Sequence, residues 1–205
     1  YDACASNGGD GRLDIYLIDF PSGADGAAQT DSCTNGVTVT CSGFMLLDSS
    51  LSHYDSFEEG VRVVGPHELF HLVQNAYAAN DDAWWGEGTA QWAADRIHPE
   101  LDDLEGFLPY FFAEPNRPLD LSGGGVTNAW LYATAIWPVF LEQYYGADAV
   151  LAVFQQSAQG IAPVLDATEA ALAAEGGVAA AYAAFASYNA ATGDRAADGQ
   201  GYLAA

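Results

Sequence analysis

Hydrophobic and polar side chains alternate near the start of the chain, which is the spacing of a half-buried β-strand. Apolar residues take every second position within residues 12–20, so a strand is predicted there. Residues 37–41 and 43–47 are short and apolar, and they predict two further strands. The intervening residues 21–36 are rich in Gly, Ala, Ser and Asp and are predicted to form a loop.

Further along the chain the spacing becomes helical. Ser56-Phe57-Glu58-Glu59 fits a capping box, so a helix is predicted over residues 57–79. Pro66 lies inside this span and either kinks the helix or begins a second one. Further helices are predicted over residues 87–97, 127–145, 148–158, 166–174 and 178–190. Residues 99–125, which contain four prolines and a Gly123-Gly124-Gly125 hinge, are predicted to be irregular.

These elements predict an α+β fold, with a small antiparallel-edged sheet near the N-terminus and a mainly helical C-terminal half. The length suits one domain with a substantial core, so we expect residues 1–205 to form a single domain. The sheet and the first long helix should occupy about residues 1–80, and the helical lobe about residues 86–205. The helix should pack beneath the sheet, with a cleft between the sheet and the lobe.

Candidate chemistry begins at residues 67–71, which read His-Glu-Leu-Phe-His. Residues four apart lie on one face of a helix, so His67 and His71 can present two imidazoles to one metal ion. Glu68 lies about 100° around the same helix, near the metal but not among its ligands. The pattern also fits a histidine pair inside an apolar core with both rings hydrogen-bonded.

A third candidate ligand, Glu87, lies within residues 84–90, which read Trp-Trp-Gly-Glu-Gly-Thr-Ala. Zinc suits two imidazoles and one carboxylate, with a fourth position left for water. Zinc lowers the pKa of that water, and a neighbouring glutamate can accept the proton. The sequence therefore predicts a zinc site with ligands His67, His71 and Glu87, and with Glu68 as general base.

These two motifs resemble those of the gluzincin metallopeptidases, most closely the bacterial secreted, peptidase MA-like branch with its Trp-x-x-Glu-Gly-x-Ala pattern. The resemblance implies a zincin-like fold with the same three zinc ligands and the same general base. It also implies that residues 43–47, the strand before the helix, form the upper edge of the cleft and pair with the substrate backbone. Specific motif matches cover residues 67–96, and a weaker similarity extends from about residue 14 to residues 185–195.

Two departures narrow this resemblance. A metzincin would carry glycine and histidine at the positions of Gln74 and Tyr77, which excludes that branch. Fifteen residues separate His71 from Glu87. This separation is shorter than in thermolysin-like or aminopeptidase-like members, so the connecting loop should be compact.

The resemblance also suggests a group that stabilises the oxyanion opposite the metal. In gluzincins of several branches, a tyrosine from a helix downstream of the glutamate ligand has this role, which points here to Tyr132. Tyr110, in the aromatic segment before it, is the alternative. Gln91 and Asp95 are candidates for groups that orient a ligand histidine.

The charge balance restricts the partners. The chain carries 28 acidic residues against 5 basic ones, for a net charge of −23. Such a surface repels phosphate backbones and anionic membranes, so we expect neither nucleic-acid binding nor membrane association. No stretch reaches eighteen apolar residues, which argues against a membrane span. We expect a monomer that acts on a peptide or protein substrate.

The chain contains three cysteines, whose pairing indicates the cellular compartment of the protein. Cys33 and Cys41 flank an Asn-Gly pair, a strong hairpin signal, so a disulfide between them is the favoured pairing. A pairing of Cys4 with one of them is the alternative. Disulfides form in oxidising compartments, which predicts a secreted, extracellular protein. The chain begins Tyr-Asp-Ala, without methionine or a signal-like segment, so we expect a processed form.

A second metal hypothesis rests on residues 7–11, which read Asn-Gly-Gly-Asp-Gly. An EF-hand loop would need acidic ligands at the positions of Ser6, Gly8 and Leu17, so that type of site is excluded. An irregular Ca²⁺ site stays open.

The leading hypothesis is a secreted zinc metallopeptidase that hydrolyses peptide bonds. Two alternatives stay open: a zinc-binding but catalytically idle interaction domain, and a helical binding protein with a chance motif. The intact Glu68 argues against an idle site. No residue pattern identifies the substrate, so a protein, a small peptide and a cell-wall crosslink are all compatible with the sequence.

Overall fold

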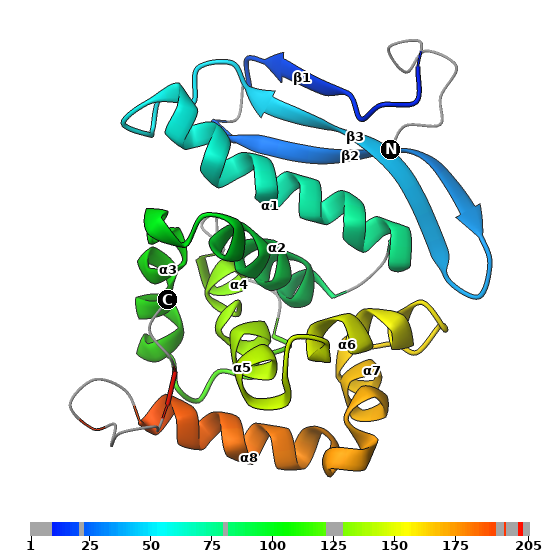
Figure 1. Cartoon of the computed structure of the whole chain (residues 1–205), viewed down its shortest axis with the longest axis vertical. Helices are drawn as coiled ribbons and strands as arrows, with labels where there is room; N and C mark the ends of the chain where they lie inside the picture. The colour runs from blue at the N-terminus through cyan, green and yellow to red at the C-terminus, as the bar shows by residue number, and fades with distance from the viewer. Residues whose placement is uncertain are drawn as a thin grey trace.

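The computed structural model describes residues 10–20, 23–79, 82–121, 129–191, 195 and 201–202. A three-stranded sheet lies at one end, the long helix α1 (Phe57–Tyr77) runs beneath it, and a lobe of helices fills the other end (Figure 1). The predicted α+β class is confirmed, with its small N-terminal sheet and mainly helical C-terminal half.

The sheet consists of β1 (Ile15–Ile18), β2 (Gly26–Asn35) and β3 (Val39–Asp48) in the order β1-β3-β2. The central strand β3 runs parallel to β1 and antiparallel to β2. β2 and β3 form a hairpin in which Cys33 and Cys41 are directly opposite each other, and the predicted disulfide between them is confirmed.

The predicted loop over residues 21–36 is wrong, because most of it forms β2. β2 is an edge strand of small and polar residues, so it shows no apolar alternation. The strands predicted over residues 37–41 and 43–47 are parts of one continuous strand, β3. A side chain at Gly43 would collide with the backbone carbonyl of Gln29, so this glycine permits the close pairing of β2 and β3.

The position of β3 corrects a second expectation. β3 is paired with β1 on one side and β2 on the other, so residues 43–47 are not available to pair with a substrate backbone. β2, in contrast, has a second edge without a partner strand in the part of the chain that the structure describes.

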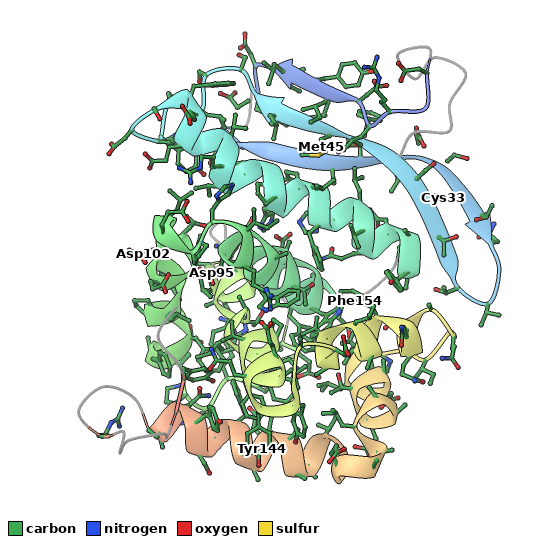
Figure 2. The ribbon with its side chains drawn as sticks, viewed as in Figure 1. Cys33, Met45, Asp95, Asp102, Tyr144 and Phe154 are labelled. Atoms are coloured by element: carbon green, nitrogen blue, oxygen red, sulfur yellow. A yellow bond between two sulfur atoms is a disulfide. The ribbon has the colours of Figure 1, made fainter. Side chains whose placement is uncertain are left out.

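Helix α1 begins as the capping box predicts. The Ser56 side chain accepts a hydrogen bond from the Glu59 backbone N–H at 3.1 Å. Pro66 lies inside one continuous helix, which excludes a second start there. The side of α1 that faces the sheet joins an apolar cluster of Met45, Leu47, Leu51, Val64 and Leu72 (Met45 is labelled in Figure 2). Burial of each large apolar side chain contributes roughly 1.5–3 kcal/mol, and this holds α1 against the sheet.

The second motif opens α2 (Ala83–Ile97), which begins earlier than predicted and ends before Pro99, as predicted. Trp84 and Trp85 in its first turn are fully buried in the core of the helical lobe. This burial fixes the start of α2, and with it the position of Glu87.

A short 3₁₀ turn (Pro99–Leu101) leads into α3 (Asp103–Ala113). The expectation that residues 99–125 are irregular is therefore wrong over α3. Gly106 and Pro109 inside α3 weaken its helical signal, because both disfavour a helix interior. The predicted glycine hinge at residues 123–125 lies outside the described residues.

The single helix predicted over residues 127–145 is instead divided into α4 (Ala129–Ala133) and α5 (Ile136–Tyr145). The break lies one turn before Pro138, which has no N–H for the Thr134 carbonyl and whose ring crowds that carbonyl. The Thr134 carbonyl accepts from the Trp137 N–H at 2.9 Å instead. The Thr134 hydroxyl lies 2.6 Å from the Leu131 carbonyl and 2.7 Å from the Trp84 carbonyl, and the second contact connects the break to α2.

The lobe is completed by α6 (Ala149–Ser157), α7 (Val164–Ala171), a 3₁₀ turn (Ala173–Glu175) and α8 (Gly177–Ala190), close to the predicted helices. Its core is aromatic: Trp137, Phe140 and Phe185 are almost completely buried, and Phe154, labelled in Figure 2, joins the same cluster.

Acidic side chains crowd the contact between α2 and α3. Figure 2 shows Asp95 on α2 and Asp102 just before α3. One oxygen of Asp95 is buried without a hydrogen-bond partner. Burial, followed by the charges of Glu105, Asp102 and Asp103, raises the pKa of Asp95 from 3.8 to about 6.

We predict that Asp95→Asn stabilises the protein at pH 7. Because the folded protein binds this proton more tightly than the unfolded chain does, stability falls as pH rises from about 4 to about 6. After allowance for solvent screening, the gain at pH 7 should be about 1 kcal/mol, and it should disappear near pH 4. Thermal unfolding at both pH values tests this, and an equal change at both would contradict it.

Candidate metal centre and cleft

The two motifs meet where α1 packs against α2. His67 Nε2 lies 3.1 Å from His71 Nε2 and 3.2 Å from Glu87 Oε2. His71 Nε2 lies 3.6 Å from the same Glu87 oxygen. Tetrahedral ligands about 2.0–2.1 Å from zinc lie roughly 3.3 Å from one another, so the three atoms are spaced as one ion requires. The three side chains could therefore hold one metal ion.

A hydrogen-bond chain through Gln74 sets the tautomer of His71. The Gln74 amide nitrogen donates to the Gly86 carbonyl at 2.7 Å and to the Thr89 hydroxyl at 2.9 Å. The Thr89 hydroxyl in turn donates to the Trp85 carbonyl at 2.6 Å. These acceptors fix the orientation of the amide, with its oxygen toward His71.

The Gln74 Oε1 atom lies 2.8 Å from His71 Nδ1 and can only accept. His71 Nδ1 therefore carries the proton, and His71 Nε2 offers a lone pair to the metal position. Gln91 and Asp95, the predicted orienting groups, do not have this role: Gln91 donates to Asp103 at 2.6 Å, and no hydrogen bond joins Asp95 to either histidine. The sequence offers one clue that Gln74 orients His71, which is that Gln74 lies one helical turn after it.

We predict that Gln74→Met weakens zinc binding by about 10–100-fold, because His71 loses the acceptor that holds its tautomer. Competition with a chromophoric chelator measures the affinity, and circular dichroism checks the fold. The matched control is Gln156→Met on α6, which should bind zinc like the wild type. Equal zinc affinity in Gln74→Met and wild type would contradict the role of this chain.

Glu68 lies beside the metal position without joining it. Its side chain is buried, with the residue 8% exposed. Burial raises the pKa of Glu68, and the charge of Glu87 adds to this, while the two histidines and the Ala28 backbone N–H act against it. Gly26 on β2 leaves room for the Glu68 side chain, because a Cβ at Gly26 would lie 2.7 Å from Glu68 Cγ.

Glu87 and the two histidines influence one another's protonation. Burial alone would raise the pKa of Glu87, but hydrogen bonds from His67 and His71 outweigh it and lower that pKa to about 2. Burial disfavours the charged form of His71, and Glu87 outweighs it to raise the pKa of His71. Glu87 is therefore ionised across the neutral range, as a metal ligand must be.

Tyr132 on α4 completes the group. Its ring stacks on the His67 ring, with centroids 5.4 Å apart, and on the Phe107 ring, with centroids 5.0 Å apart. Burial, then the charges of Glu87 and Glu68, raises the pKa of Tyr132, whose hydroxyl also hydrogen-bonds Glu87. The hydroxyl therefore stays protonated and can donate. Tyr110 is 54% exposed on α3 and does not line the cleft.

A cleft joins these groups. One cavity of about 390 Å³ lies over the metal position, and a second of about 290 Å³ extends toward α3. Both are lined by Gly26, His67, Glu68 and Tyr132. The start of β2, residues 26–28, borders the first cavity. The cleft thus lies between the sheet side and the helical lobe, as predicted.

Within the part of the chain that the structure describes, His67, His71 and Glu87 are the one group of three side chains positioned to hold a metal ion. The Ca²⁺ hypothesis falls largely on residues 7–9, which lie outside the described residues, as does Cys4. Asp10, which is described, pairs with Arg12.

No protein-family model, curated protein or solved structure matches this chain significantly. Across the described residues, none of the helices has both the length and the apolar character needed to span a membrane.

Proposed function

We propose that the protein is a secreted zinc metallopeptidase of the gluzincin type, with a zincin-like arrangement of sheet edge, α1 and helical lobe. The observation that carries the proposal is the convergence of three ligand atoms, spaced 3.1–3.6 Å apart, beside the buried Glu68. The Cys33–Cys41 disulfide is compatible with an extracellular location.

His67, His71 and Glu87 would hold the zinc ion, which would supply Lewis acidity to polarise a carbonyl and to lower the pKa of water. Glu68 accepts the proton from the attacking water and passes it to the leaving amine. Its buried position and raised pKa suit a base that must also act as an acid.

The substrate backbone pairs with β2. Its second edge has no partner strand among the described residues, and its first residues border the metal position. Adding a strand there would hold a peptide extended across the cleft, with its carbonyl directed toward the ligands. This proposal moves the substrate-binding edge from residues 43–47 to β2.

Tyr132 donates a hydrogen bond to the developing oxyanion. We predict that Tyr132→Phe lowers kcat by about ten- to a thousandfold with zinc content unchanged. Tyr110→Phe is the matched control, because it removes the same hydroxyl from an exposed site on α3. Loss of kcat in the Tyr110 variant and not in the Tyr132 variant would reassign the role.

The deciding experiment combines zinc content with peptide cleavage. Full-length protein from an oxidising host should hold about one zinc per chain and cleave members of a diverse peptide library. A chelator should abolish cleavage, and added zinc should restore it. Zinc without any cleavage would favour the idle interaction domain, and absence of zinc binding would contradict both.

A further inference from the structure

The smaller cavity extends from Glu68 and His67 toward the start of α3. Two acidic residues from distant parts of the chain line it: Asp25, which precedes β2, and Asp103, which opens α3. Neither lysine nor arginine is among its lining residues. The cavity is therefore negative on two sides and opens onto the proposed catalytic group.

Neutral groups hold both carboxylates in place. Gln91, only 2% exposed, donates its amide to Asp103 at 2.6 Å. The Tyr54 hydroxyl donates to Asp25 at 3.4 Å. Neutral donors position a carboxylate without cancelling its charge, so the cavity keeps an uncompensated negative potential. His53, whose side chain is 66% exposed, lies 3.1 Å from Asp25, closer than Tyr54. Among the described partners of the two carboxylates, it is the one that can carry a positive charge.

The charges of Asp25 and Asp103 both reach the same part of the cavity. Burial raises the pKa of Tyr54, and the next contributions come from the charges of Asp25 and then Asp103. Both carboxylates are therefore within electrostatic range of one hydroxyl that lines the cavity. Neither belongs to a group of three potential metal ligands in the described chain, which favours an organic cation as occupant.

The rest of the wall is apolar or aromatic, with Val64, Phe107 and Tyr132 among the lining residues. Long basic side chains combine an apolar stem with a charged end, and such a wall covers the stem. Arginine and lysine have the shape and charge that this cavity complements.

We propose that this cavity binds the arginine or lysine side chain of a substrate residue next to the scissile bond, with Asp25 and Asp103 as the specificity-determining residues. The inference rests on the proposed peptidase function, since it names the substrate class of that cleft. It narrows the substrates to peptides and proteins with exposed basic residues. The net charge of −23 would also attract such substrates at low salt.

Binding tests the cavity independently of catalysis. The probes are two fluorescein-labelled alanine-based hexapeptides, identical except for one central arginine or its neutral isostere citrulline. Fluorescence anisotropy measures their binding to zinc-loaded Glu68→Gln protein, which should not consume them. The arginine peptide should bind about ten- to a hundredfold more tightly at low salt, and the difference should shrink as salt rises.

Variants that each remove one negative charge test which carboxylates cause the preference for arginine. Adding Asp103→Asn or Asp25→Asn to the Glu68→Gln protein should reduce the preference for arginine by about three- to tenfold. Asp166→Asn is the control, because it removes one negative charge from the exposed start of α7, a helix that packs on α6 and α8. An unchanged preference in both cavity variants, or an equal loss in the Asp166 variant, would overturn the assignment.

Cleavage separates this inference from the function on which it rests. Wild-type protein on a peptide library should cut next to arginine or lysine. Cleavage without preference for basic residues would reject the specificity and leave the peptidase in place. A preference in binding without any cleavage would support the cation site and reject the hydrolysis.

Discussion

The Glu68→Gln variant is expected to keep its zinc and its fold and to lose peptide hydrolysis by about two to four orders of magnitude. The amide has the size of the carboxylate, so it fits the space left by Gly26 beside β2. Its oxygen can still accept the Ala28 N–H. What it lacks is a lone pair basic enough to take the proton of the attacking water.

The measurement is kcat/KM on a cleaved library peptide, with zinc content determined on the same sample. Glu58→Gln is the matched control, because it makes the same change on the exposed first turn of the same helix. The control should keep wild-type activity. Substantial hydrolysis by the Glu68 variant at full zinc occupancy would show that another group is the base.

Glu87→Ala is expected to cause the largest loss of zinc affinity, beyond the roughly 10–100-fold typical of losing an outer-shell partner. It removes the one carboxylate of the group and leaves two imidazoles, which are too few for a stable zinc site. It also removes the acceptor that lies 3.2 Å from His67 and 3.6 Å from His71.

Chelator competition should show this loss, with Glu105→Ala on the exposed side of α3 as the control for a lost carboxylate. Peptide hydrolysis should fall in parallel with zinc occupancy. Wild-type zinc affinity in the Glu87 variant would assign the third ligand position to a different residue.

The local parts of the site could be predicted from the sequence because they depend on helical spacing alone. His67 and His71 share a face at any position in any fold, and the Ser56 cap determines where their helix begins. Glu87 is a different case. Its distance from the histidines depends on how α1 and α2 pack. The sequence suggested Glu87 as a third ligand by residue type and by the resemblance of the second motif, but helical spacing could not place it beside the histidines.

The features that the sequence did not predict have one physical reason in common. They depend on tertiary contacts, which leave no local pattern in the sequence. β2 is a strand because β3 pairs with it, although its own side chains are small and polar. Gln74 matters because the Gly86 carbonyl, twelve positions later, orients its amide. Asp25 and Asp103 approach one cavity only after α3 folds against α2, and residues 99–125 gave no signal of a helix there.

Gly26 has a consequence for any comparison of this chain with others. A methyl group at this position would lie 2.6 Å from Val64 Cγ1 and 2.7 Å from Glu68 Cγ. Such contacts would force either β2 away from α1 or Glu68 out of its place. A homologue could therefore keep every chemically reactive side chain and still be a pseudoenzyme through one added carbon. The glycine that opens β2 is therefore as necessary to the proposed arrangement of the site as its histidines are.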